Sequence, residues 1–279
     1  MKLCTVQPHM SDSISDNVAA ITKWIHRAAG SGADVVVFPE MMLTGYDQHL
    51  HSLFKMPGWY AQVEEALRAL GEIARETGTS VLVGSPYRIG DGYLNALVLL
   101  QSGAAPILAG GRTQIEENFK TMWGFAEAED RTPVEIQDIA LGSVFCHEAF
   151  SLEITKGKGL GKSDVILWPS GSINSEKNKQ NEITTDNSIV GARKIARYYG
   201  IPVIQANYIS HATQESSEQA ESWGYVIGGS VVCDAEGRVL DQASRTKEDM
   251  LMIDIVRDNG NIAVKLAGNG ADRADRRSG

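Results

Sequence analysis

Cysteine is scarce in this sequence. Only three occur in 279 residues, Cys4, Cys146 and Cys233, and no two of them are close together. An odd number of cysteines without CxxC spacing argues against a disulfide framework and against a thiolate zinc site. His49 and His51 form an HxH pair with no third ligand nearby, which is weak evidence for a metal, and we expect them in a solvated loop. Any one of the three thiols could still be a nucleophile.

Basic runs and long apolar runs are also lacking. The formal net charge is -9, from 35 acidic and 26 basic residues, and no Lys/Arg-rich run precedes the C-terminal tail. This argues against nucleic acid and anionic membranes as partners. The first residues contain no apolar stretch of the kind found in signal peptides, and no uncharged run is long enough to cross a bilayer. We therefore expect a soluble, cytoplasmic protein.

The apolar pattern predicts strands alternating with helices. With 43% hydrophobic residues, the chain can bury one large core. The predicted strands are 2–7, 33–39, 80–87, 95–101, 105–110, 141–150, 163–171 and 203–208, and the predicted helices are 14–30, 60–78 and 187–200. The runs 228–234, 238–242 and 249–255 resemble a β-meander with a tight turn at "DAEG". Because each half carries such a set, we expect two stacked sheets with helices outside.

Three reactive side chains stand at the edges of apolar runs. Glu40 follows "VVVFP", Cys146 follows "SVF", and Lys120 lies within "ENFKTMW". A thiolate that attacks a carbonyl or nitrile carbon needs a base for its proton and a positive donor where negative charge develops. Glutamate, lysine and cysteine supply these roles. For Lys120 an alternative stays open, because "TQIEENFKTMW" also reads as an ordinary amphipathic segment with acidic neighbours.

The blocks "VVFPEMMLTGY", "NFKTMW" and "VFCHEAF" resemble the three catalytic blocks of the nitrilase superfamily of carbon-nitrogen hydrolases. The later blocks "DVILWPSG", "ARKIARYYGIPVIQANY" and "WGYVIGGSVVCDAEGRVL" resemble that family too, in the same order. The resemblance implies an α/β fold, a four-layer α-β-β-α sandwich of the nitrilase type, usually paired into a homodimer or larger homo-oligomer. It also implies Glu40 as general base, Cys146 as nucleophile and Lys120 as the stabilising cation. No cofactor and no metal would be needed.

The segment around the lysine departs from the usual family pattern. An aromatic and a basic residue commonly precede the lysine, where this chain has Asn118 and Phe119, and the stretch from Lys120 to Cys146 is short. A second glutamate often lies in this stretch. Glu127 is the preferred candidate on its spacing from the lysine, and Glu129 is the alternative.

Other residues near these blocks have weaker assignments. Tyr46, Trp168 and Ser170 are candidates for substrate binding, although tethering of its own loop is an equal possibility for Tyr46. His147 follows Cys146 directly, and adjacent residues in a strand point to opposite faces, so we do not expect it to meet the thiol. For Glu148 we expect a structural salt bridge to an arginine. Cys4 and Cys233 lie inside strand-like runs, and we expect them to be buried.

The resulting functional hypothesis is an amidase-type hydrolase of non-peptide C–N bonds, with a small amide or N-carbamoyl substrate. The alternatives are a nitrilase, an N-acyltransferase with the same triad, and a catalytically silent member that acts in binding or assembly. We expect residues 1–260 to form one carbon-nitrogen hydrolase domain. Residues 261–279 would form a C-terminal extension that is mobile or involved in assembly.

Overall fold

The computed structural model describes residues 1–45, 50–171, 175–177, 183–210, 225–226, 228–258 and 260–267. Its helices are α1 (Ile14–Gly30), α2 (Leu50–Phe54), α3 (Trp59–Thr77), α4 (Glu117–Trp123) and α5 (Asn187–Tyr199), with 3-10 turns η1 (Cys146–Phe150), η2 (Leu152–Thr155) and η3 (Leu160–Lys162). Within these residues no helix combines the length and the apolar character that a membrane span requires.

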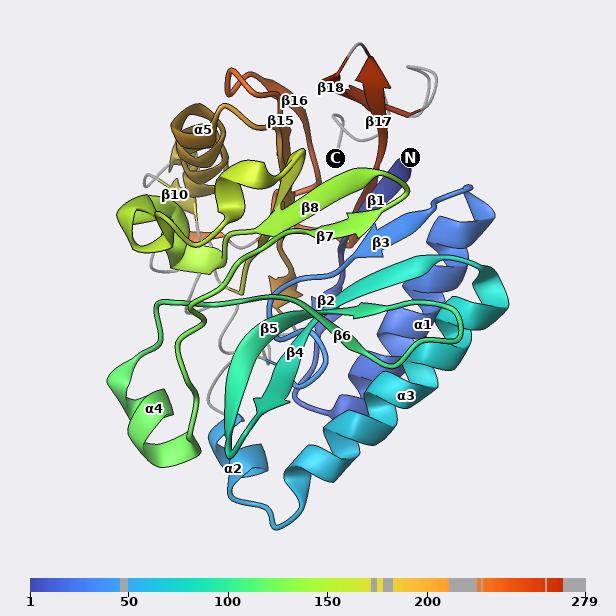
Figure 1. The fold of residues 1–279 in the computed structure, drawn as a ribbon, viewed down its shortest axis with the longest axis vertical. Helices are drawn as coiled ribbons and strands as arrows, with labels where there is room; N and C mark the ends of the chain where they lie inside the picture. The colour runs from blue at the N-terminus through green and yellow to red at the C-terminus, as the bar shows by residue number, and fades with distance from the viewer. Residues whose placement is uncertain are drawn as a thin grey trace.

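Two large sheets form the centre of the molecule (Figure 1). The first has the order β18 (Asn261–Leu266), β17 (Asp249–Asp258), β1 (Lys2–Gln7), β3 (Val35–Val37), β4 (Ser80–Ile89), β5 (Gly92–Leu100) and β6 (Ile107–Gly111). The second has the order β16 (Val239–Gln242), β15 (Val231–Cys233), β12 (Val203–Ala206), β9 (Val165–Pro169), β8 (Ile139–Ser143) and β7 (Val134–Ile136). In each sheet three neighbouring strands run parallel, namely β1, β3 and β4 in the first and β8, β9 and β12 in the second.

Two small sheets complete the described strands. One joins β11 (Ile183–Thr185), β10 (Ser175–Lys177) and β14 (Tyr225–Val226), and the other pairs β13 (Ile209–Ser210) with β2 (His9–Met10).

Three apolar clusters divide the fold into four layers. The first cluster packs α1 and α3 on one face of the first sheet, the second fills the space between the sheets, and the third packs α5 on the outer face of the second sheet. Figure 1 accordingly shows α5 and the pair α1 and α3 on opposite sides of the strands. The run 35–37 is apolar throughout because Val36 faces the helices while Val35 and Val37 face the other sheet. The α-β-β-α sandwich expected from the sequence is confirmed.

The helix boundaries follow from local chemistry. Ser13 caps α1 by accepting a hydrogen bond from the backbone N–H of Asp16, and Asp186 caps α5 by accepting one from Ile189. Gly78 and Gly200 end α3 and α5 in the left-handed conformation. The predicted helices 14–30, 60–78 and 187–200 are therefore confirmed to within one or two residues.

Three expectations need correction. The run 249–255 does not continue a meander: β17 leaves the β15–β16 hairpin and pairs with β1 in the other sheet. The predicted strand 141–150 ends at Ser143, because Cys146 begins a 3-10 turn. The segment 261–266 is a strand paired with β17, so this part of the expected extension belongs to the first sheet; residues 268–279 lie outside the described residues.

Candidate active site

Glu40 stands just beyond the end of β3. The strand delivers it into a tight turn, where Met41 has a positive φ of 52° and the Glu40 side chain is fully buried. Gly84 of β4 permits this turn, because a Cβ atom there would lie 2.1 Å from the carbonyl oxygen of Pro39 and 2.5 Å from the backbone nitrogen of Met41. The carboxylate is thus held by a strained turn packed directly on a neighbouring strand.

Cys146 occupies the corresponding place beyond β8. It is fully buried, begins η1, and adopts a positive φ of 44°, which is uncommon for a residue with a side chain. Trp168 of β9 fixes its backbone by donating a hydrogen bond from Nε1 to the Cys146 carbonyl at 2.9 Å. Such conformations cost about 1–3 kcal/mol and concentrate at functional sites.

The Cys146 thiol and the Glu40 carboxylate lie against each other. Burial raises the pKa of the Cys146 thiol to about 12, and the charge of the neighbouring Glu40 carboxylate adds to that rise. Arg112 and the backbone N–H of Gly171 act in the opposite direction. At neutral pH the thiol is therefore protonated, and it carries its proton beside a carboxylate able to remove it.

Arg112 and Asn95 hold one oxygen of that carboxylate. Oε1 of Glu40 accepts from Nδ2 of Asn95 at 2.8 Å and from Nη1 of Arg112 at 3.0 Å. All three side chains are buried. No N–H or O–H group of the described residues reaches the other oxygen, Oε2. One carboxylate oxygen is thus anchored, and the second is left to take a proton.

Glu148 braces the two loops that carry Arg112 and Cys146. Its carboxylate accepts from the backbone nitrogens of Thr113 at 2.7 Å, Gln114 at 3.0 Å and Phe145 at 2.9 Å. It also accepts from Nη2 of Arg131 at 2.5 Å, and both partners of this ion pair are fully buried. The salt bridge to an arginine that we expected for Glu148 is present, and it fixes the segments on either side of the site.

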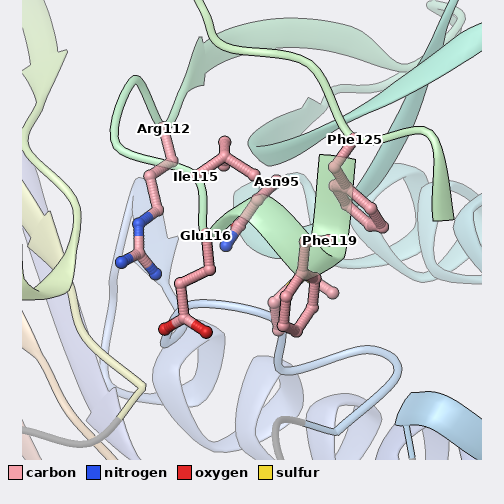
Figure 2. Close-up of a pocket in the computed structure, with 7 residues that line it drawn as sticks. Asn95, Arg112, Ile115, Glu116, Phe119 and Phe125 are labelled. Carbon is pink, nitrogen blue, oxygen red and sulfur yellow. The ribbon is translucent and has the colours of Figure 1, made fainter. Parts of the chain in front are cut away.

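A small pocket adjoins this arrangement. It has a cavity volume of about 20 Å³, and it is lined by Met41, Asn95, Arg112, Ile115, Glu116, Phe119 and Phe125. Figure 2 shows the Arg112 guanidinium and the Glu116 carboxylate extending to one side, with the rings of Phe119 and Phe125 on the other. The residues that anchor Glu40 therefore also form part of a pocket wall.

Comparison with known proteins places the chain in a family. The family model described as carbon-nitrogen hydrolase matches residues 2–261. This chain belongs to the carbon-nitrogen hydrolase family. A glutamine-dependent NAD(+) synthetase of Rhodobacter capsulatus is 22% identical over 258 residues, which are 91% of this chain and 43% of that protein. The chain thus spans under half the length of that relative.

Solved structures of the family share the fold. An amidase from Nesterenkonia sp. AN1, with acrylamide added at its active-site cysteine, matches with a TM-score of 0.71 at 18% identity, over 92% of this chain and 94% of that one. A glutamine-dependent NAD+ synthetase from Acinetobacter baumannii matches with a TM-score of 0.72 at 16% identity, over 96% of this chain and 47% of that one. At these identities the likeness concerns the fold.

Lys120, which we expected to be the cation of the site, contacts a different glutamate from Glu40. It sits on α4, a helix with no buried residue, and forms an ion pair with Glu127, whose side chain is 49% exposed. The hydrogen bond that Lys120 donates to Glu127 raises the pKa of Lys120. No described contact joins Lys120 or Glu127 to Glu40 or Cys146. The cation in contact with Glu40 is Arg112, which lies outside the sequence blocks that indicated the site.

The remaining candidates have mainly structural contacts. Trp168 is buried in the α5 layer, and Ser170 accepts from Nε2 of Gln205 at 3.2 Å and donates to the Trp168 carbonyl at 3.2 Å. Neither lines the described pocket. His147 is exposed and packs near the ring of Phe150, away from the thiol.

Several candidates cannot be placed. Tyr46 and His49 lie outside the described residues, as does the side chain of His51. Glu129 is exposed, and its candidacy as a second glutamate, like that of Glu127, stays a prediction.

A local signal for Arg112 was nevertheless present in the sequence. It stands one residue after β6, as Glu40 and Cys146 stand just after β3 and β8. Polar residues at the ends of strands converge at one edge of a sheet sandwich, so this position alone made Arg112 a candidate. The resemblance of "NFKTMW" to a catalytic block of the family favoured the later segment instead.

Proposed function

We propose that the chain hydrolyses small amides through a thioester on Cys146, with Glu40 as general base. The observation that carries this proposal is the buried contact between the Cys146 thiol and the Glu40 carboxylate, because a protonated thiol needs a base within reach. Membership of the carbon-nitrogen hydrolase family supports the reaction class.

The reaction follows from these positions. Sulfur attacks the amide carbon while Glu40 takes the thiol proton, and a tetrahedral intermediate forms. Glu40 then returns that proton to the leaving nitrogen, the C–N bond breaks, and ammonia departs from a thioester. Water attacks the thioester as Glu40 accepts its proton, and the carboxylic acid leaves while the thiol is reformed.

We propose Arg112 as the cation of the site. Its guanidinium is buried and bonded to Glu40, which orients the carboxylate, and its charge favours the thiolate that forms during attack. Lys120 stays a second candidate for stabilising the intermediate, since α4 carries both this lysine and residues of the pocket wall.

The names of relatives suggest which substrates to test first. One similar protein is a glutamine-dependent NAD(+) synthetase and another is an amidase, so glutamine and simple aliphatic amides come first, followed by N-carbamoyl compounds and nitriles. We also propose that the protein acts in the cytoplasm as a homodimer or larger homo-oligomer, which light scattering on the purified chain would measure.

The test is an ammonia-release assay on the wild type, Cys146→Ala and Glu40→Gln. We expect the substitutions to lower turnover by at least roughly 1000-fold, because each removes a group that takes part in bond making. Cys233→Ala, a buried thiol remote from the base, is the matched control and should keep its activity. Circular dichroism verifies folding. Turnover retained by Cys146→Ala would refute the proposal, and products formed only with an added amine would show an acyltransferase.

A further inference from the structure

Two hydrogen-bond acceptors of the pocket beside Glu40 have no donor among the described residues. Asn95 must direct Nδ2 at the carboxylate of Glu40, because its oxygen would be repelled there, so its Oδ1 points elsewhere. This Oδ1 is buried and accepts no hydrogen bond from a described residue, although Asn95 is only 6% exposed. A buried acceptor without a donor costs about 1–3 kcal/mol, and a ligand N–H would remove that cost.

Glu116 supplies the second acceptor and a negative charge. It is the N-cap residue of α4, yet its side chain makes no capping hydrogen bond, and it forms no ion pair within the described residues. Its carboxylate lines the pocket, as Figure 2 shows. Arg112 is the only cation in the described lining, and it forms an ion pair with Glu40. The exposed wall of the pocket therefore carries a carboxylate that forms no ion pair with a described residue.

The other walls are apolar and the rim is acidic. Met41, Ile115, Phe119 and Phe125 provide surfaces suited to a short hydrocarbon chain, and aromatic rings also attract cations. Outside the pocket, Glu117 lies next to Glu116, while the charge of Lys120 is taken by Glu127. A ligand that carries a carboxylate would be repelled here.

We infer that the substrates are small amides with a positive charge at the end away from the reacting group, held by Glu116 across an apolar linker. This inference rests on the proposed amide hydrolysis. It narrows the substrate class, because N-carbamoyl amino acids and other anionic amides become poor substrates. Glu116 would be a specificity-determining residue, and Asn95 would accept an N–H of the bound molecule.

The experiment compares three amides of matched length: γ-aminobutyramide, which is cationic, pentanamide, which is neutral, and glutaramic acid, which is anionic. We expect wild-type kcat/KM to fall in that order. In Glu116→Gln the advantage of the cationic amide over pentanamide should shrink roughly fivefold to tenfold, mainly through the KM of the cationic amide. Glu116→Lys should favour glutaramic acid. Glu117→Gln, on the same helix but outside the pocket lining, is the matched control and should behave as wild type.

A binding measurement separates this inference from the proposed function. Calorimetric titration of Cys146→Ala with γ-aminobutyramide reports on the pocket without turnover, and Cys146→Ala combined with Glu116→Gln should bind it roughly fivefold to tenfold more weakly. Amide hydrolysis that does not depend on Glu116, or a wild-type preference for the anionic amide, would refute the inference about substrate charge but not the proposed hydrolase activity. Glu116-dependent binding without hydrolysis of any amide would support Glu116 as a binding residue and refute the proposed hydrolase activity.

Discussion

Replacing Glu148 by glutamine tests whether its buried carboxylate holds the candidate site together. The substitution keeps the shape but removes the charge that faces Arg131, and both side chains are fully buried. A buried ion pair that loses one partner costs about 3–5 kcal/mol, because the remaining charge is left uncompensated. Arg131 would keep its hydrogen bonds to the Thr113 hydroxyl and the Ser143 carbonyl, which places the expected loss near the lower end, at about 3 kcal/mol.

The loss also includes backbone hydrogen bonds. One carboxylate oxygen of Glu148 accepts from Thr113 and Gln114, and the other accepts from Phe145. An amide can offer its oxygen to only one of these sides, so at least one backbone N–H faces an NH2 group and is left without an acceptor. Because these segments flank Arg112 and Cys146, kcat should fall together with stability.

Urea unfolding and calorimetry measure the effect. A loss of about 3 kcal/mol corresponds to a fall in melting temperature of roughly 6–12 °C for a domain of this size. Glu72→Gln is the matched control, since its ion pair with Arg75 is exposed and should contribute under about 1 kcal/mol.

The cause of the loss can be tested with a second variant. Glu148→Gln combined with Arg131→Met removes the uncompensated guanidinium and should recover part of the stability. An unchanged melting temperature in Glu148→Gln, or a double variant no more stable than the single one, would refute the reasoning.

Substitutions at four further positions have definite expected outcomes. Arg112→Met should lower kcat for ammonia release by at least roughly 100-fold while Arg112→Lys keeps most of it, because the charge beside Glu40 is what the site uses. Burial raises the pKa of Cys4 to about 12 from 9.0, so above pH 9 the unfolded chain releases a proton that the folded chain keeps, and stability falls as pH rises. Cys4→Ala should make that fall shallower by about 1.4 kcal/mol per pH unit, measured by urea unfolding at successive pH values. Gly191→Ala should destabilise by about 1–3 kcal/mol, since its Cβ would lie 2.2 Å from the ring of Trp168, whereas Gly71→Ala, in open space on α3, should stabilise by about 0.5–1 kcal/mol, both read from melting temperatures.

Most of the fold could be predicted because its signals are local. Helical spacing, a capping serine and a terminal glycine specify α1 and α3 within a few residues of sequence. The partner of a strand is not local information. An apolar alternation over 249–255 indicates a strand but not that it pairs with β1, some 240 positions earlier along the chain, so the meander was the wrong choice.

The residues of the candidate site also divide into those that local sequence indicates and those that only tertiary contacts reveal. Glu40 and Cys146 could be found because each follows an apolar run and belongs to a recognisable block. Arg112 follows β6 just as closely, but its role depends on its contact with Glu40, 72 positions away in sequence. Nothing in the segment around Lys120 reveals that its helix buries no residue, because burial depends on what the rest of the chain places beside it.

The three cysteines show that the neighbours of a thiol, and not its pKa, identify the candidate nucleophile. Burial is the main reason that the pKa values of Cys4, Cys146 and Cys233 all rise to about 12, so thiolate content at neutral pH does not single out any of them. The largest charge effect on Cys4 and on Cys233 comes from an arginine, whereas the largest charge effect on Cys146 comes from the buried Glu40 carboxylate. The same carboxylate that suppresses the resting thiolate is thus the group that can take its proton when an electrophilic carbon arrives. Since Glu40 has one oxygen tied to Arg112 and Asn95, the proton has a single place to go, and the strained turns at Met41 and Cys146 hold donor and acceptor in that relation.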